Sequence, residues 1–328
     1  MIDKATRSAG ESTEKSFAWI VAGYNEADPY LRLRQQAISD WHRVEDELNG
    51  QLRIDWPGAL TWLGSTMETE NLMRKLKNYD SNVRLVEQQE IRFLEPNLKT
   101  VPALAMFAED EGAINPALTA NLLIKAAREA GAKVQLDNEV SSFITDESRI
   151  VGVVTKNGHA KADMVVLATG ANTATVCQPL NIKLPIDPSP AILMEFHNSH
   201  RFVNRIVSNP FMEIRAASEL LTLAAEDYID DSIQNNPHSL AQQTIERIKT
   251  HWQGVEQIRL AKIMVGNRPM PKDGLPVIGR TTDIDGLYFC VMHSGITLAA
   301  IAGRLAAAEI LTCQDDTLLS SYRPQRFN

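Results

Sequence analysis

The sequence has little cysteine. Its three cysteines, Cys177, Cys290 and Cys313, lie far apart among 328 residues and form no C-x-x-C pair. This spacing excludes a disulfide framework and a cysteine-based zinc site, and it is typical of a reducing compartment. Basic residues are also in deficit, because 33 Lys and Arg stand against 41 Asp and Glu and give a net charge of −8. We therefore expect no nucleic-acid partner.

No targeting segment or membrane span is visible in the sequence. The first residues are polar and charged, whereas a signal peptide carries an apolar core. The most apolar stretch, residues 296–311, is interrupted by Arg304 and Glu309, which is typical of a buried helix. Together with the scarcity of cysteine, these features predict a cytoplasmic protein.

Motifs for metal binding and for several kinds of hydrolysis are missing as well. His197 and His200 lie close together but lack a third ligand, so we expect a loop there and no metal. The chain contains no G-x-S-x-G turn and no phosphate-binding P-loop. It contains no internal repeat either.

The sequence does have a large apolar fraction and a β-α-β pattern. Hydrophobic residues make up 44% of the chain, enough to bury the core of one large or two ordinary domains. A candidate strand at 105–108 precedes a helix that starts at Asn115-Pro116 and stops at Gly131. Residues 163–168 form a continuous apolar run, as in the buried strands of parallel sheets.

Other elements follow from hydrophobic periodicity and turn residues. Asn157-Gly158 predicts a hairpin turn after a strand at 150–155. Periodicity predicts helices at 29–48, 66–78 and 239–252, and short strands at 51–55, 59–63 and 133–136. The whole pattern predicts an α/β nucleotide-binding layer, assembled from separated stretches, and a second domain rich in antiparallel strands.

Two further stretches are candidates for a functional segment. Residues 166–171, Val-Leu-Ala-Thr-Gly-Ala, read as a strand that ends in a turn of small residues, where backbone can approach a ligand closely. Residues 6–16 contain three serines and one glycine and run into Phe17 and Trp19, which favour a packed segment. The alternative for the second stretch is a disordered polar N-terminus.

A third stretch combines an arginine with a helix start. Arg268 lies in Gly266-Asn267-Arg268-Pro269, where prolines stiffen the loop, and a planar guanidinium matches a carboxylate in geometry. The alternative is a surface arginine paired with Asp273. Residues 294–298 then open the last predicted helix, whose free N–H groups carry a partial positive charge.

Residues 6–20, 109–170 and 264–327 together resemble the D-amino-acid oxidase and glycine oxidase superfamily of FAD-dependent oxidoreductases. The resemblance implies a mixed α/β fold with a Rossmann-like FAD-binding domain and an antiparallel-sheet substrate domain. It assigns 1–23, 107–179 and 264–328 to the FAD-binding domain, and 24–106 and 180–263 to the substrate domain.

The resemblance also implies site residues. Arg268 would bind the substrate carboxylate, and the start of the last helix would face the N1 and O2 edge of the flavin. His293 is a candidate catalytic base, although a lone histidine beside a helix start is more often structural. The implied FAD-contacting residues are Ser8, Gly10, Ser16, Val140, Ala168, Thr169, Gly170, Gly295, Ile296, Thr297 and Leu298. For Val140, whose backbone would meet the adenine, plain core packing is the alternative.

Two features separate the sequence from the superfamily pattern. His293 and Ser294 depart from glycine oxidases, which leaves the substrate open. Residues 1–5 cannot supply a strand, a G-x-G-x-x-G turn, a helix and the acidic residue for the adenosine ribose. We therefore expect the chain as given to bind FAD weakly and the strand at 163–168 to lack a neighbour.

Two functions follow from the sequence. The first is FAD-dependent oxidation of an amine or amino acid, of D-amino-acid or glycine/sarcosine-like type, by hydride transfer to flavin N5. The second is a truncated, non-catalytic remnant or subunit that binds FAD weakly or needs a completing chain. The expected partners are a small-molecule amine or amino-acid substrate, and either a second copy or a completing polypeptide.

Overall fold

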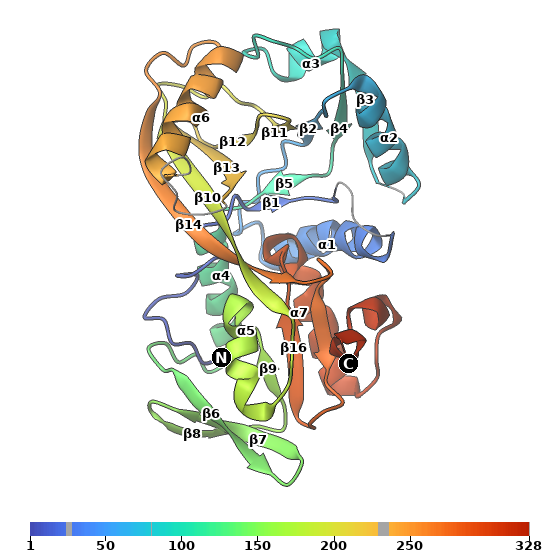
Figure 1. The fold of residues 1–328 in the computed structure, drawn as a ribbon, viewed down its shortest axis with the longest axis vertical. Helices are drawn as coiled ribbons and strands as arrows, with labels where there is room; N and C mark the ends of the chain where they lie inside the picture. The colour runs from blue at the N-terminus through green and yellow to red at the C-terminus, as the bar shows by residue number, and fades with distance from the viewer. Residues whose placement is uncertain (24–27, 80, 229–235, 328) are drawn as a thin grey trace.

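The computed structural model describes residues 1–23, 28–79, 81–228 and 236–327. One half of the molecule contains a large sheet, and the other contains a smaller sheet flanked by helices (Figure 1). The strand β14 (Arg259–Pro271) runs from the large sheet toward the smaller one. The mixed α/β fold expected from the sequence is confirmed.

The large sheet has eight strands, antiparallel except for one parallel pair, β11 with β2. Its first four strands in spatial order all contribute to the site described below. The order is β14, β10 (Ile186–His197), β13 (Leu221–Asp227), β12 (Met212–Ser218), β11 (Ile206–Asn209), β2 (Ala59–Thr61), β4 (Leu104–Ala108) and β3 (Val83–Glu87).

The two faces of this sheet have different neighbours. On the outer face, α6 (Pro237–His251) and α3 (Gln88–Leu94) cover a core that includes Phe196, Phe202 and Trp252. On the inner face, Leu193 and Leu223 pack with Phe17 and Trp19 of the N-terminal segment. Strand alternation therefore places every second residue of β10, β12 and β13 toward the other half of the molecule.

The smaller sheet contains β15 (Val277–Arg280), β16 (Leu287–Val291) and β9 (Val165–Leu167) in that order. The pair β16 and β9 is parallel. The other edge of β9 has no strand beside it in the described part of the chain, and Val166 is 44% exposed. The expected open edge of this strand is thus present, although the strand has one neighbour.

Helix α7 (Gly295–Thr312) packs along the smaller sheet and against α1 (Asp28–Glu47). Arg304 of α7 holds Asp40 of α1 through two nitrogens, the closest contact being 2.8 Å. The indole N–H of Trp41 donates to the carbonyls of Ile296 and Thr297. We keep the two-domain division as a proposal, with one correction: α1 belongs with the FAD-binding stretches, because its apolar face packs on α7.

By length and composition alone, α7 could cross a membrane; among the described residues no other helix passes that test. Its residues Leu298, Ile301 and Leu305 are buried in the core beside α1. The expectation of a buried helix in this stretch is therefore confirmed for one face of α7.

The remaining elements connect these layers. They are β1 (Trp19–Ile20), paired with β5 (Gly112–Ala113), the hairpin sheet of β6 (Val140–Asp146), β7 (Arg149–Thr155) and β8 (Gly158–Lys161), and the helices α2 (Thr66–Lys77), α4 (Pro116–Glu129) and α5 (Thr173–Cys177). Short 3-10 helices span Gly170–Asn172 (η1), Gln178–Leu180, Thr317–Tyr322 and Pro324–Phe327.

Most expected elements are present within a few residues of their predicted ends, but two expected strands are wrong. Residues 51–55 form turns and one isolated bridge from Asp55 to Ala113. Residues 133–136 make one isolated parallel bridge, Gln135 with Ile2. Neither stretch has a partner strand along its length in the described residues, so neither forms a β-ladder.

Candidate active site

The ends of two parallel strands bring distant motifs together. Leu167 of β9 pairs with Phe289 of β16, so the turn at 168–170 and the start of α7 leave the sheet at the same edge. Ligands of open α/β sheets bind outside this carboxyl edge. The tertiary structure thus places the two predicted FAD-contacting stretches side by side.

The turn at 168–170 leaves its backbone accessible. Ala168 and Thr169 are exposed, and Gly170 has a φ of 54° with open space where a Cβ would stand. The hydroxyl of Thr169 lies 2.9 Å from that of Thr173 and so is engaged within the turn. A ligand would therefore meet backbone atoms and small side chains here.

At the start of α7, two of the four predicted FAD-contacting residues have structural side chains. The Thr297 hydroxyl donates to Trp19 O at 3.1 Å and accepts from Val21 N. Leu298 is buried in the core, and its N–H donates to Ser294 O. Only the backbone N–H groups at the first turn, at Gly295, Ile296 and Thr297, are positioned as a helix N-terminal anion site.

His293 lies directly before this helix and is half-buried. Its Nδ1 is 3.5 Å from the Ser294 hydroxyl, a long contact between neighbours in sequence. The position is near the carboxyl edge of β16, as expected, but the contact by itself assigns no catalytic role.

The N-terminal loop uses its predicted hydroxyl groups to hold its own shape. The Ser8 hydroxyl donates to Asn121 Oδ1 of α4 at 2.5 Å, and Ser16 Oγ accepts from Ala18 N. Ala18 has a φ of 57°, so the Ser16 contact stabilises a tight bend. Gly10 lies between these residues, half-buried in the loop. The Ser8 oxygen can still accept a hydrogen bond, and the Ser16 hydroxyl can still donate one.

The same loop is attached to the strand that carries Arg268. The Ser12 hydroxyl donates to Asn267 O at 2.5 Å. A Cβ on Gly266 would lie 3.0 Å from Lys15 Cβ, so glycine at this position allows the loop to approach. The helix η1, which follows the turn at 168–170, packs against β14 as well. The strand β14, which carries Arg268, therefore contacts both the N-terminal loop and the helix η1.

Arg268 is already bound by several groups. Its Nη1 lies 2.9 Å from Asp227 Oδ1, and its Nη2 donates to Ser189 Oγ at 2.9 Å. Longer contacts run to the carbonyls of Ser189 and Pro190. The sequence-based alternative partner is wrong, since Asp273 pairs with Arg326 instead, at 2.7 Å.

A second carboxylate lies beside this pair. Glu213 opposes Ala225, and Ala225 lies two residues before Asp227 on β13, so both acidic side chains are on the inner face of the sheet. Burial, and then the Asp227 charge, raise the pKa of Glu213 to about 7, against a lowering effect of Arg268. Sequence reasoning missed Asp227 and Glu213, because period-2 alternation shows a shared face only once strand register is known.

The N-terminal residues lie against the segment that precedes β6. Ile2 bridges Gln135 in parallel, Asp3 N donates to Gln135 O, and Asn138 N donates to Asp3 O. Asp3 directly follows this isolated bridge, and its carboxylate accepts from Ala5 N at 2.8 Å. Val140, half-buried, begins β6 a few residues beyond this bridge.

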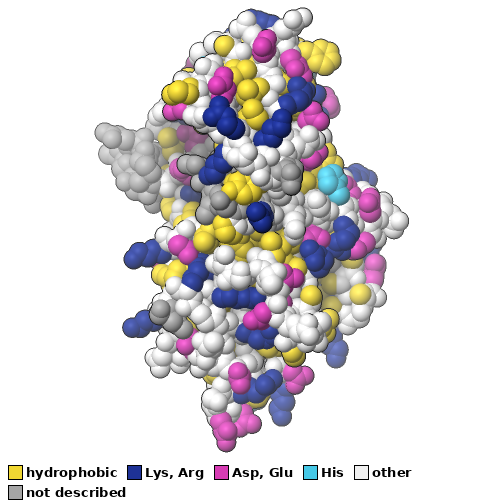
Figure 2. Space-filling model, turned by 90° about the vertical axis from the view of Figure 1, so that its right-hand side faces the viewer, with side chains coloured by type: hydrophobic (Ala, Val, Ile, Leu, Met, Phe, Trp, Pro, Cys, Tyr) yellow, Lys and Arg dark blue, Asp and Glu magenta, His cyan; other side chains and the backbone are white. Residues whose placement is uncertain are grey.

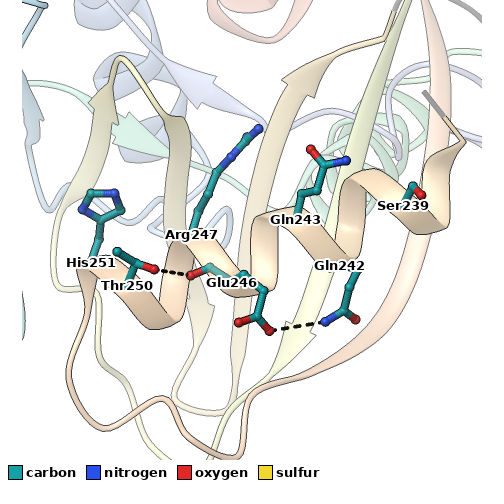
Figure 3. Close-up of a pocket in the computed structure, with 7 residues that line it drawn as sticks. All are labelled: Ser239, Gln242, Gln243, Glu246, Arg247, Thr250 and His251. Atoms are coloured by element: carbon teal, nitrogen blue, oxygen red, sulfur yellow. Dashed lines mark hydrogen bonds between the residues drawn. The ribbon is translucent and has the colours of Figure 1, made fainter. Parts of the chain in front are cut away.

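A different hollow lies on the outer side of α6 (Figure 3). Its volume is about 530 Å³, and the polar side chains that line it all belong to this one helix, with Gln242 bonded to Glu246. It lies across the sheet from Arg268 and carries no group suited to redox chemistry. On the face in Figure 2, acidic and basic side chains are interspersed. The described residues contain no group of three or more potential metal ligands.

Comparison with known proteins decides the family. The sequence pattern of the family described as FAD dependent oxidoreductase (DAO) matches residues 1–309. The chain belongs to this family. The family is FAD-dependent, and its members catalyse oxidation, so the superfamily expected from the sequence is confirmed.

Relatives within the DAO family agree on amino-acid oxidation in general. Glycine oxidase of Bacillus licheniformis is 27% identical over 313 residues, covering 92% of this chain and 84% of that protein. Glycine oxidase of Pseudomonas aeruginosa is 24% identical and covers 83% and 78%. A D-amino acid dehydrogenase of Cereibacter sphaeroides is 25% identical over 55% of this chain and 42% of its own length.

Solved structures confirm the fold. Glycine oxidase from Geobacillus kaustophilus has a TM-score of 0.86 at 20% identity and covers 99% of this chain and 91% of its own. L-amino acid deaminase from Proteus vulgaris has a TM-score of 0.89 at 18% identity and covers 99% and 86%.

The residues of the site fit FAD. A dinucleotide needs accessible backbone beside a strand end and N–H groups directed at its negative charge. The turn with Gly170 supplies the first, with free space at the Cβ position, and the start of α7 supplies the second. Asp3 is an acidic residue that directly follows the isolated parallel bridge of Ile2 with Gln135.

Proposed function

We propose that this chain catalyses FAD-dependent oxidation of an amine or amino acid whose carboxylate is bound by Arg268, with D-amino acids and glycine or sarcosine as the first candidates. The observation that carries the proposal is the attachment of Arg268 to the flavin side of the site. Ser12 bonds Asn267, next to Arg268, and η1 packs on the same strand. The arginine therefore stands beside the predicted FAD-contacting stretches.

We propose the following roles for the residues of the site. Arg268 orients the substrate through its carboxylate, since a guanidinium keeps its charge when desolvated. The N–H groups at the start of α7 stabilise negative charge at the site. FAD, when bound, supplies the two-electron acceptor for the hydride of the substrate α-carbon. We propose His293 as the catalytic base, because it lies directly before this helix start.

For cofactor binding, we assign mainly backbone groups. Ser8, Gly10 and Ser16 would act mainly through loop N–H groups, since the Ser8 and Ser16 hydroxyls each already make one hydrogen bond within the protein. Residues 168–170 and Val140 would contribute small side chains and backbone. Asp3 is a new candidate for the ribose hydroxyls, from its position after the Ile2 bridge.

The direct test is bleaching of the flavin without oxygen. The protein is loaded with FAD and mixed anaerobically with glycine, sarcosine, D-alanine or a simple amine, while absorbance at the flavin bands is followed. We expect reduction by an amino acid and little by an amine without carboxylate. If no amine or amino acid reduces the bound flavin, the proposed function is wrong.

A second candidate is a non-catalytic protein that keeps the fold. The open edge of β9 favours it, because backbone N–H and C=O groups along that edge have no partner strand in the described residues. Flavin content of the purified protein separates the two: a stoichiometric yellow protein supports the enzyme, and a colourless protein that never takes up FAD supports the remnant.

A further inference from the structure

The inner face of the large sheet carries two carboxylates beside Arg268. Register places them in a diagonal row: Arg268 opposes Ser189, Asp227 opposes Ala191 two residues on, and Glu213 opposes Ala225 of β13. Diagonal neighbours of this kind come within reach of long side chains. One guanidinium thus stands next to two acidic groups, in the order Arg268, Asp227, Glu213.

Arg268 has little capacity left for a second carboxylate while Asp227 is bound. Nη2 and Nε are directed at Ser189 and Pro190, and one N–H of Nη1 is taken by Asp227. However, the Asp227 side chain is 80% exposed, and exposed ion pairs contribute only about 0–1 kcal/mol. A substrate carboxylate can therefore displace Asp227 from Arg268 at small cost.

Glu213, unlike Asp227, has no ion pair with Arg268. It is half-buried, and no described residue donates a hydrogen bond to its carboxylate. The groups that face it are Asp227 on β13, Arg268 farther along the row, Arg215 two residues on along β12, and neutral Ser208 on β11. Arg215 is occupied, because it donates to the carbonyls of Phe17 and Ile114. Within the described ranges, Glu213 thus has no cationic partner of its own.

We infer that Asp227 and Glu213 form the cation-binding half of the substrate site and bind a protonated nitrogen of the substrate whose carboxylate Arg268 binds. When the substrate carboxylate takes the place of Asp227, that side chain is released next to Glu213, and a substrate ammonium compensates both. The inference rests on the proposed function in placing the substrate at Arg268. It adds to the proposed function the two side chains that would meet the substrate nitrogen.

The assignment also predicts the direction in which ligand binding changes with pH. Glu213, with its pKa near 7, gains its charge as pH rises from about 6 to 8. Binding of an ammonium group should strengthen over that window in the unaltered protein. It should not do so in Glu213→Gln, whose amide cannot ionise.

Matched pairs of ligands isolate the cation. Glycine and propionate have the same size and carboxylate and differ by the ammonium group. D-lysine and D-norleucine differ by an ammonium at the side-chain end. Binding is measured by calorimetry on the FAD-loaded protein after chemical reduction of the flavin, so that no ligand is consumed. The first pair reports an α-ammonium, and the second a side-chain ammonium.

We expect the cationic member of at least one pair to bind about tenfold more tightly than its neutral partner, the worth of one charge-assisted hydrogen bond. Asp227→Asn and Glu213→Gln should each remove most of that ratio. Asp227→Asn should also strengthen propionate binding, since Arg268 loses its internal competitor. A misfolded variant would not bind propionate more tightly while it binds the cationic ligand more weakly.

The control is Glu226→Gln, on the same strand but directed at Thr244 and Arg247 on the outer face, contacts that an amide oxygen retains. It should leave both ratios unchanged. Equal binding within both pairs, or ratios that survive both acidic substitutions, would overturn the inference. If no amine reduces the flavin while the ratios behave as expected, the proposed function fails and the cation site stands.

Discussion

Arg268 Nη1 lies 2.9 Å from Asp227 Oδ1, across the intervening strand β10. The arginine predicted to bind a substrate carboxylate is therefore held by a carboxylate of the protein itself. Because Asp227 is largely exposed, this pair orients the guanidinium at little energetic cost. An internal ligand of this kind keeps the arginine in one rotamer while leaving it available to a substrate.

The first prediction concerns Arg268. Arg268→Ala should lower kcat/KM for carboxylate-bearing substrates about a hundredfold, the loss expected for a charge-assisted bidentate pair. Most of the change should be in KM, with flavin content unaltered, since Arg268 contacts Asp227 and Ser189 rather than the turn at 168–170. Steady-state kinetics on the FAD-loaded protein measure this. An unchanged KM for every such substrate would reject the role of Arg268.

The second prediction concerns FAD affinity. Gly170 has a φ of 54° and open space where a Cβ would stand, so a ligand can approach the turn at 168–170 closely. Gly170→Val should weaken FAD binding, because a β-branched side chain is strained at this φ and occupies the open space. Fluorescence titration with FAD compares the two proteins. An unchanged affinity would contradict the role of this turn in FAD binding.

The third prediction concerns Glu95, which directly follows α3. Its Oε1 accepts from the backbone N–H groups of Asn204 and Arg205, and burial raises its pKa to about 8. The unfolded carboxyl titrates near 4.5. Between these values the unfolded state loses the proton first, so stability should fall as pH rises from about 5 to 8, by at most about 1.4 kcal/mol per pH unit.

Glu95→Gln keeps the accepting oxygen and removes the titration. Its melting temperature should therefore vary less with pH over this window than that of the unaltered protein, measured by differential scanning calorimetry. Identical pH profiles for the two proteins would show that Glu95 does not titrate there.

The fourth prediction concerns Glu309, which anchors the chain end to α7. Glu309 is 1% exposed; it accepts from both terminal nitrogens of Arg323 and, at 2.7 Å, from the Tyr288 hydroxyl. Glu309→Ala should cost about 3–5 kcal/mol, because it leaves a partly buried arginine without its partner. Urea unfolding measures the loss.

The double variant Glu309→Met with Arg323→Met provides the comparison. Replacing both partners by apolar side chains of similar length should cost less than Glu309→Ala alone, since no unpaired charge remains. A double variant that is less stable than the single one would mean that the ion pair itself is strongly net stabilising.

Several local features could be predicted from residue order because their causes are local. The helix at 29–48 follows from its apolar periodicity, and Asn115-Pro116 begins α4, where the Asn115 side chain accepts from Leu118 N. Asn157-Gly158 correctly predicted a hairpin between β7 and β8, although the two turn residues are Lys156 and Asn157 and Gly158 already pairs with Thr155. The expected strand at 133–136 failed, because its only partner in the described chain is Ile2.

The sequence by itself determined the family, the candidate arginine and the helix start at 294–298, since each depends on a short run of residues. Only the tertiary structure decided what surrounds them. Strand register brought Asp227 and Glu213 beside Arg268, although the two acids lie 41 and 55 residues from it in the chain. Packing turned Thr297 and Leu298 into the core and α1 onto α7. Such contacts depend on which strands pair and which faces meet, and no local pattern carries that information.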